Sequence, residues 1–405
     1  MLFTKPKKAV GLDIGTHSVK AVQMSRAKGR LRVEAVCQAL VDRNAVTVDP
    51  VEAHANAVRE AVRRMDPAQS LVVAALAGQT AVIRYPRLPD MPFEQIGQAI
   101  ESEAGQNIPY DLSEVYLDWS LLDTVTEGEE KMLRILLVAA KHAVIEARTQ
   151  VTEAAELQCG VMTVDSLALA DAAECCDLLR VGESVALINI GLNSASIHFT
   201  KDGVSNFIRD VNWGAREFIQ AVAKSQRVDY DAAERLLQEY ADNQEKSDGE
   251  PDAELPEENP KVEEEERSAP LTSFDDPLAP LDEELEHLPG KTGASAGKPK
   301  GDKALGEVLT TALGRLISEV RRSFDYYEHQ LYERPVDRLI LSGGIAHLPL
   351  LRESLAEELG VERVEVANPS ESALLVDEEP LRTMQDHPAR YMVAVGLAAR
   401  GMAEL

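Results

Sequence analysis

The fold is decided by residues 10–24, which read Val10-Gly-Leu-Asp-Ile-Gly-Thr-His-Ser-Val-Lys-Ala-Val-Gln-Met24. An apolar run reaches Asp13, and the small polar loop Gly15-Thr16-His17-Ser18 follows. Apolar and polar residues then alternate again, and this period of two is typical of a strand. The loop therefore joins two antiparallel strands. This excludes a Walker A loop and a dinucleotide fingerprint, because both need a helix directly after the glycines.

This loop has the chemistry of an anion site. Gly15 permits a tight turn and a close approach of the backbone to a ligand. Successive N–H groups in such a turn form a nest that attracts anions. Asp13, at the end of the first strand, can hold a hydrated Mg²⁺ through its carboxylate oxygens.

The pattern recurs in residues 185–199, Val185-Ala-Leu-Ile-Asn-Ile-Gly-Leu-Asn-Ser-Ala-Ser-Ile-His-Phe199. Either copy alone is an ordinary hairpin, because Asp and Gly mark many such turns. Two copies in one chain indicate two related lobes that bind a polyphosphate between them, with one loop from each lobe. In this respect the sequence resembles the superfamily of actin, Hsp70 and the sugar kinases.

Composition limits the other functions. The chain has 405 residues, enough for two or more domains, and a net charge of −27. Residues 241–290 hold 18 acidic and 3 basic side chains. We expect a disordered insert over about 243–303, because this stretch is too polar to offset its ordering entropy. We expect no nucleic-acid partner, since there is no basic patch to release counterions. Without a signal peptide or a membrane span, we expect a cytoplasmic protein.

Further elements follow from spacing. Residues 31–40 predict a strand, 51–65 a helix, and 304–334 a long amphipathic helix. A strand at 338–341 leads into Gly343-Gly344, where the missing side chains would let a flat ring lie on the backbone. Glu101 and Glu103 resemble a catalytic pair, but they face different ways on a helix, so a solvated face is the better interpretation.

Three groups of residues together resemble one family. They are Gly11-Leu-Asp-Ile-Gly15 with Ser18-Val-Lys20, Ile108-Pro-Tyr110 with Leu117-Asp118, and Tyr391-Met-Val-Ala-Val-Gly-Leu-Ala398. Over almost the whole chain except about 243–303, the sequence resembles the PilM family of type IV pilus assembly proteins, with the cell-division protein FtsA as a cousin.

The resemblance implies an α/β protein with two actin-like lobes, each built on a ribonuclease-H-like mixed sheet. A small α+β subdomain would be inserted in the first lobe and the acidic loop in the second. The implied parts are lobe 1 at 1–181 with its insert at about 82–162, lobe 2 at 182–379 with its insert at about 243–303, and a C-terminal helix at 380–405 that returns to lobe 1.

The resemblance also implies ATP and Mg²⁺ in the cleft between the lobes. The implied nucleotide contacts are Asp13, Gly15, Thr16, His17, Ser18 and Lys20 in the first loop, Asn189, Gly191, Asn193 and Ser194 in the second, Gly214 at a helix start, and Gly343 and Gly344 at the adenosine. Asp13 would reach Mg²⁺ through water. Asp165 either caps a helix or faces Mg²⁺ and the attacking water.

The implied role is a cytoplasmic platform, peripheral to the inner membrane through a partner. That partner would be the cytoplasmic tail of a PilN-like inner-membrane protein, held between the first lobe and the inserted subdomain. Other pilus assembly components are further implied partners, and a homo-oligomer stays open.

Two positions depart from the family pattern. Asn189 stands where the second loop usually has Asp, and Leu237 stands where a lysine is usual. Both changes predict weak nucleotide binding and at most slow ATP hydrolysis. A pseudo-ATPase adaptor of a pilus or type II secretion system is therefore the main alternative. A small-molecule kinase is a second one, although no sugar-kinase motif is present. An FtsA-like filament former is a third; FtsA-like chains usually end in an amphipathic membrane helix, whereas the residues after Gly401 are Met-Ala-Glu-Leu405.

Overall fold

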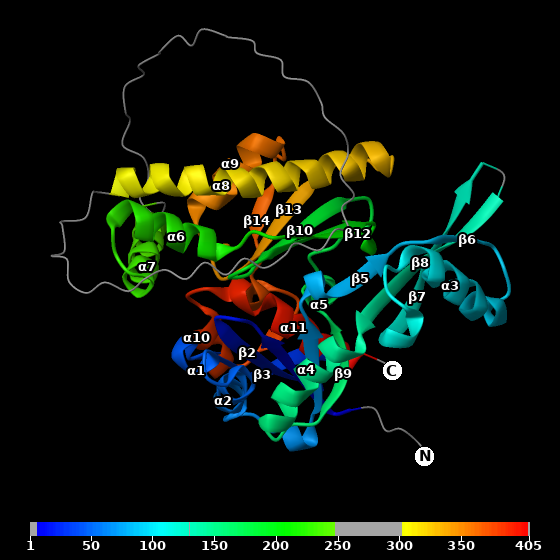
Figure 1. Ribbon diagram of the computed structural model, residues 1–405, viewed down its shortest axis with the longest axis horizontal. Coiled ribbons are helices and arrows are strands. Elements are labelled where there is room, and N and C mark those ends of the chain that lie inside the picture. The colour runs from blue at the N-terminus through cyan, green and yellow to red at the C-terminus, as the bar shows by residue number, and fades with distance from the viewer. Residues whose placement is uncertain (1–5, 129, 248–301, 404–405) are drawn as a thin grey trace, which may run out of the picture.

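The structure is a computed structural model that describes residues 6–128, 130–247 and 302–403. Most of the predicted acidic insert lies outside these ranges. Figure 1 shows two lobes stacked one above the other, with a smaller subdomain projecting to the side (cyan). A mixed sheet forms the centre of each lobe.

The first sheet has six strands in the order β15-β3-β2-β1-β4-β9. Its strands are β1 (Lys8–Ile14), β2 (Ser18–Ala27), β3 (Arg30–Leu40), β4 (Leu71–Leu76), β9 (Cys159–Val164) and β15 (Leu375–Val376). β1 and β2 form the predicted antiparallel hairpin, with Asp13 opposite Lys20, and β4 runs parallel to β1. Helices α2 (Pro50–Val62) and α4 (His142–Ala154) cover one face of this sheet through small apolar residues such as Ala55 and Val58. The short α1 (Arg43–Val46) precedes α2.

The second sheet repeats this arrangement in the order β12-β11-β10-β13-β14. Its strands are β10 (Ser184–Ile190), β11 (Ala195–Lys201), β12 (Val204–Val211), β13 (Arg338–Gly343) and β14 (Val364–Val366). The β10–β11 hairpin places Asn189 opposite Ser196, and β13 runs parallel to β10. The predicted internal repeat is therefore a repeat of structure: each hairpin is followed by a parallel neighbour.

Helices α6 (Ala215–Gln226), α7 (Tyr230–Ser247), α8 (Asp302–Asp325) and α9 (Pro349–Leu359) cover the second sheet. α8 continues into a π-helical turn at Tyr326–Gln330 and lies along the top of the lobe in Figure 1. Aromatic rings fill the core beneath it, where Phe199 stacks on Tyr327 at 4.5 Å between ring centroids. α7 runs to Ser247, so helix extends a few residues into the predicted disordered insert, which was expected to start at about 243.

Two helices cross between the lobes, α5 (Asp165–Cys175) and α11 (Met392–Met402). A Cβ at Gly396 would lie 1.7 Å from the carbonyl oxygen of Ala168, so the two helices touch backbone to backbone. A Cβ at Gly11 would lie 2.2 Å from the carbonyl oxygen of Ala394. The small residues that the sequence places on the last helix therefore set the spacing between α11, α5 and β1. α10 (Glu378–Met384) and β15 lead the chain back to the first sheet, where β15 pairs with β3.

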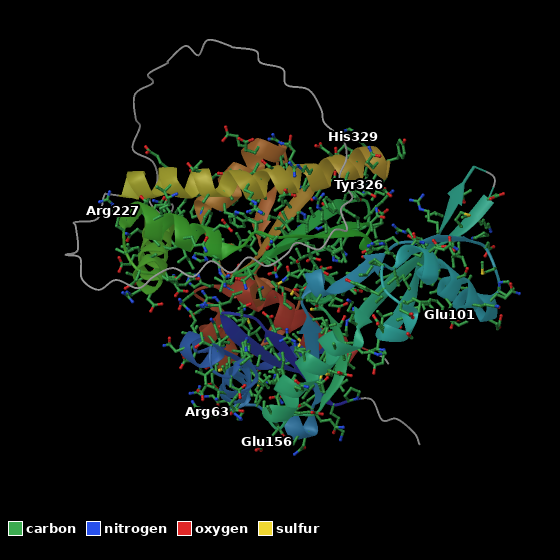
Figure 2. The ribbon with its side chains drawn as sticks, viewed as in Figure 1. Arg63, Glu101, Glu156, Arg227, Tyr326 and His329 are labelled. Atoms are coloured by element: carbon green, nitrogen blue, oxygen red, sulfur yellow. The ribbon has the colours of Figure 1, made fainter. Side chains whose placement is uncertain are left out.

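The projecting subdomain is an antiparallel sheet in the order β5-β8-β6, with β7 also paired to β8. Its elements are β5 (Ala81–Arg84), β6 (Arg87–Pro89), α3 (Phe93–Asn107), β7 (Val115–Glu127) and β8 (Glu130–Lys141). The predicted insert of about 82–162 is too long, because α4 and β9 pack in the first lobe. Glu101 lies on the outer side of α3, as the predicted solvated face requires (Figure 2). No helix in the described ranges is long and apolar enough to cross a membrane.

Candidate functional site

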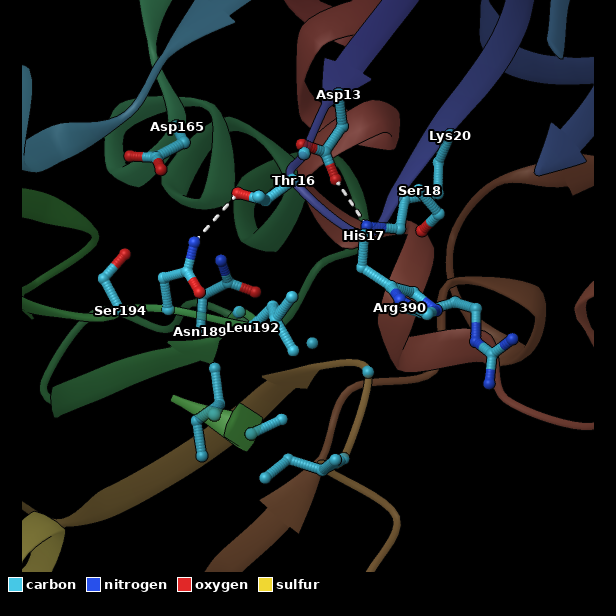
Figure 3. Close-up of a pocket in the computed structure, with 18 of the residues that line it drawn as sticks. Asp13, Thr16, His17, Ser18, Lys20, Asp165, Asn189, Leu192, Ser194 and Arg390 are labelled. Atoms are coloured by element: carbon cyan, nitrogen blue, oxygen red, sulfur yellow. Dashed lines mark hydrogen bonds and ion pairs between the residues drawn. The ribbon is translucent and has the colours of Figure 1, made fainter. Parts of the chain in front are cut away.

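The two hairpin loops face each other across a cleft between the lobes. The cleft has a cavity volume of about 420 Å³ and is lined by residues of both loops. Asn193 of the second loop donates a hydrogen bond from Nδ2 to Thr16 Oγ1 of the first, over 3.2 Å (Figure 3). The two equivalent loops, one from each lobe, therefore contact each other through polar side chains.

The loops close in the same way. In the first loop, the Gly15 N–H donates to the Ser18 carbonyl over 3.2 Å, and in the second, the Gly191 N–H donates to the Ser194 carbonyl over 2.9 Å. A Cβ at either glycine would lie 3.1 Å from that carbonyl oxygen. Glycine at these positions keeps both turns tight, which brings their backbones close to whatever the cleft holds.

The predicted site residues gather here, with one exception. Those in the cleft wall are Asp13, Gly15, Thr16, His17, Ser18, Lys20, Asn189, Gly191, Asn193, Ser194, Gly343 and Gly344. Gly214 is not among them. It precedes α6, and a Cβ there would lie 2.4 Å from the Leu192 carbonyl oxygen, so this glycine supports the second loop from behind.

The backbone geometry at position 343 itself requires glycine. Its φ of 103° is one that residues with side chains rarely adopt, and a Cβ would lie 2.1 Å from the Ile190 carbonyl oxygen. The end of β13 therefore lies close against the end of β10, and Gly344 follows in the cleft wall.

The hairpins differ in charge at equivalent positions. Asp13 Oδ2 lies 3.2 Å from Lys20 Nζ, in a half-buried ion pair (Figure 3). In the second hairpin Asn189 Oδ1 accepts a hydrogen bond from Ser342 Oγ over 3.2 Å. The cleft therefore carries one loop carboxylate where a symmetric site would carry two.

Three further carboxylates line the cleft, those of Asp165, Asp210 and Glu234, and the first two have raised pKa values. Burial, together with the nearby charges of Asp210 and Asp13, raises the pKa of Asp165 to about 8. Its Oδ1 also accepts from the Ser166 N–H over 2.7 Å, so Asp165 both faces the cleft and bonds the first turn of α5. Burial raises the pKa of Asp210, near the end of β12, to about 6. The Asp210 carboxylate lies against Gly78, where a Cβ would be 2.4 Å from Oδ1.

Two arginines that sequence reasoning missed also line the cleft. Arg148 Nη1 donates to the Ile14 carbonyl over 2.9 Å, and Arg390 Nη1 donates to Gln38 Oε1 over 3.0 Å. Burial lowers the pKa of both, and Asp13 and Asp165 partly offset the effect at Arg148. Neither arginine forms an ion pair with an acidic side chain of the described ranges.

The family model described as type IV pilus assembly protein PilM matches residues 11–246 and 294–402. This chain belongs to the PilM family. A solved structure of a PilM–PilN type IV pilus biogenesis complex is similar at 22% identity, with 98% of this chain and 99% of that chain covered and a TM-score of 0.71. The predicted family and two-lobed actin-like fold are confirmed.

More distant similarities have TM-scores below 0.5. The ethanolamine utilization protein EutJ of Carboxydothermus hydrogenoformans is 14% identical over 98% of this chain and 90% of that one, with a TM-score of 0.48. MreB 5 of Spiroplasma citri, bound to AMPPNP, is 12% identical over 97% and 95%, with a TM-score of 0.47.

Side chains join the two lobes of this PilM-family protein at the mouth of the cleft. Arg43 of α1 forms ion pairs with Asp231, at 3.0 Å, and with Glu234, both on α7. Its guanidinium also lies 4.3 Å from the centroid of the Tyr230 ring. His17 Nδ1 lies 3.4 Å from Glu234 Oε1. Burial lowers the pKa of His17, and Glu234 partly offsets this. We call these residues the α1–α7 clasp.

A second hollow lies on lobe 1 of the PilM-family fold, where the inserted subdomain begins and ends. This groove has a volume of about 510 Å³ and is mostly apolar. It is lined by Pro50, Val51 and His54 of α2, by Leu76 at the end of β4 with Ala77 and Thr80 after it, and by Ala143, Val144, Ala147, Arg148 and Val151 of α4. The sequence predicted such a groove only through the family resemblance, without naming its residues.

Proposed function

We propose that this PilM-family protein binds Mg-ATP between its lobes and holds the cytoplasmic tail of a PilN-like inner-membrane protein. It would thereby lie at the inner membrane through its partner. The observation that carries the proposal is the pair of matching loops that face each other in one cleft, Gly15 to Ser18 and Gly191 to Ser194.

The residues in the cleft fit a nucleotide. Arg148 and Arg390 line the cleft and form no ion pair with an acidic side chain of the described ranges, so their positive charge suits a polyphosphate. Several buried polar atoms there have no hydrogen-bond partner in the described part of the protein, namely Asn193 Oδ1, Arg390 Nε and His347 Nε2. A bound ligand would satisfy them, because buried polar groups rarely stay unpaired.

Mg²⁺ would arrive with the nucleotide. No group of three or more His, Cys, Asp or Glu side chains among the described residues is arranged to hold a metal ion. Mg²⁺ commonly binds through one or two carboxylates, waters and substrate phosphates. Asp13 is suited to this role, through water, because it is the carboxylate at the end of the first strand beside the first loop, and its ion pair with Lys20 would adjust to the bound ion.

The acidic residues of the cleft are poorly suited to fast hydrolysis of ATP. Without nucleotide or Mg²⁺, the pKa of Asp165 is raised to about 8, so this carboxyl holds its proton at pH 7 and is a poor general base. Asn189 offers no charge to a metal ion. We therefore propose that ATP acts as a conformational ligand of the two lobes.

The groove beside α4 fits the PilN tail. It is apolar, it adjoins the root of the inserted subdomain, and the similar PilM structure is a complex with PilN. An extended apolar segment would bury its side chains against Val144 and Val151. Other pilus components and a homo-oligomer remain predictions.

Fluorescence anisotropy tests the tail site. The probe is a labelled synthetic peptide of the cytoplasmic tail of the PilN encoded in the same genome. Ala147→Trp fills the groove and should weaken binding at least tenfold, whereas Glu153→Trp, on the exposed side of the same helix, should leave binding unchanged. Failure of the wild type to bind, or equal binding by Ala147→Trp, would contradict the assignment.

The pseudo-ATPase adaptor is favoured by one observation, the replacement of the second loop carboxylate by Asn189. It predicts tail binding without nucleotide binding. Isothermal titration with Mg-ATP separates the two functions, because only the nucleotide-binding protein should bind it.

A further inference from the structure

The nucleotide cleft and the α4 groove share a wall. Three residues line both cavities: Leu76, Ala77 and Arg148. Leu76 is the last residue of β4, next to the strand that carries Asp13. Only a few side chains therefore separate the two cavities.

Arg148 reaches from one cavity to the other. Its guanidinium donates to the carbonyl of Ile14, the residue just before the first loop, over 2.9 Å. On the same helix, Val144 and Val151 lie one turn before and after it and line the groove. Arg148 is thus part of the groove wall, while its charged end bonds the backbone just before the first loop.

We propose that Arg148 couples the two sites, so that an extended peptide in the groove strengthens the binding of a polyphosphate in the cleft. This inference rests on the proposed function and adds its regulation. A peptide packed against α4 would hold the Arg148 stem, and the guanidinium would then be fixed toward Ile14 and the loop.

The physical reason is the cost of ordering a long cationic side chain. In the described part of the protein, the Arg148 guanidinium is held by a hydrogen bond to Ile14, so a phosphate that accepts further charge-assisted hydrogen bonds from it must restrict it more. If a peptide has already immobilised it, the nucleotide meets a smaller entropy cost, which is positive coupling. Coupling is reciprocal, so ATP must strengthen peptide binding by the same factor.

Calorimetry can measure this coupling directly. The Kd of Mg-ATP is measured with and without a saturating amount of the synthetic PilN tail peptide, for the wild type, Arg148→Lys and Arg148→Met. Arg63→Met is the matched control, because Arg63 lies on the surface of the same lobe (Figure 2) and is more than half exposed. Circular dichroism shows whether each variant is folded.

We expect the peptide to lower the ATP Kd of the wild type and of Arg63→Met by roughly fivefold or more. The factor should fall to nearly one in Arg148→Met and lie between in Arg148→Lys, which keeps the charge but loses the planar fork. If Arg148→Met binds too weakly to titrate, the Arg148→Lys factor decides the test.

Each other result has a definite meaning. A wild type that binds both ligands independently, or in which the peptide weakens ATP, overturns the coupling and leaves the proposed function standing. A wild-type factor retained in both Arg148 variants overturns the role of Arg148. A wild type that fails to bind the peptide or Mg-ATP overturns the proposed function, and the coupling with it.

Discussion

Replacing Asp165 by Asn should change how the stability of the ligand-free protein depends on pH. The folded-state pKa of about 8 is above the ordinary value of 3.8. The folded protein therefore keeps a proton on Asp165 at pH values where the unfolded chain has lost it. Stability from this group is fully present below pH 4 and is lost as pH rises toward 8. Asn resembles the protonated acid in shape and does not titrate.

The magnitude follows from proton linkage. One proton held by the folded state alone lowers the free energy of unfolding by about 1.4 kcal/mol per pH unit. Between pH 5 and pH 7 the wild type should lose roughly 3 kcal/mol more than Asp165→Asn. For a folded lobe of about 200 residues, this free-energy difference corresponds to a drop in Tm between pH 5 and pH 7 that is roughly 5 to 10 °C larger in the wild type than in Asp165→Asn. Asp210, whose pKa is raised to about 6, titrates in both proteins and largely cancels.

Differential scanning calorimetry without nucleotide or Mg²⁺, at several pH values from 5 to 8, measures this difference. Asp49→Asn is the matched control, because Asp49 caps α2 at the surface by accepting from the Glu52 N–H over 3.0 Å. If Tm depends on pH in the same way in the wild type and Asp165→Asn, the raised pKa of Asp165 is wrong, because this carboxyl would then be ionised in the folded protein.

Three other substitutions test the geometry. Gly396→Ala should cost about 3 kcal/mol or more of stability in chemical denaturation, since its Cβ would lie 1.7 Å from the Ala168 carbonyl oxygen; a loss below about 1 kcal/mol would contradict the tight helix crossing. Arg43→Ala should cost under about 1 kcal/mol, because its pairs are exposed, but should speed hydrogen exchange around Glu234; unchanged exchange there would mean that the clasp does not hold the lobes. Asn189→Asp should tighten Mg-ATP binding a few-fold, on the order of 1 kcal/mol, and only when Mg²⁺ is present, as calorimetry with and without EDTA would show.

The hairpins and their loops could be predicted because neighbouring residues in the sequence specify them. The period of two on both sides of Gly15 and Gly191 specifies strands, and the glycines specify tight turns. The same argument applied twice predicted two sheets with one design. The close contact between Gly396 of α11 and the backbone of α5 could also be predicted, because a run of small residues on a helix permits close packing.

The missed residues depend on packing between distant segments. Arg148 is an arginine on an amphipathic helix, which by itself indicates a solvated face, and only the fold brings it to Ile14. Asp210 continues an ordinary alternation in β12, and its raised pKa comes from burial that the sequence does not reveal. Arg390 joins the cleft because the chain returns to the first lobe after β15.

The boundary predicted for the inserted subdomain was wrong for an equally plain reason. β8 passes directly into α4 between Lys141 and His142, without glycine or proline to mark the end of the inserted subdomain. Gly214 at the nucleotide, which the family resemblance implies, stays a prediction; in the structure its missing side chain makes room for the backbone of the second loop.

Isothermal titration of Mg-ATP into the wild type and Asp13→Ala shows whether the cleft between the lobes binds Mg-ATP. We expect one site per chain in the wild type and a Kd at least tenfold weaker in Asp13→Ala, because the loop carboxylate suited to the Mg²⁺ is lost. No binding by the wild type at millimolar Mg-ATP, or equal affinity in the two proteins, would contradict binding of Mg-ATP in this cleft.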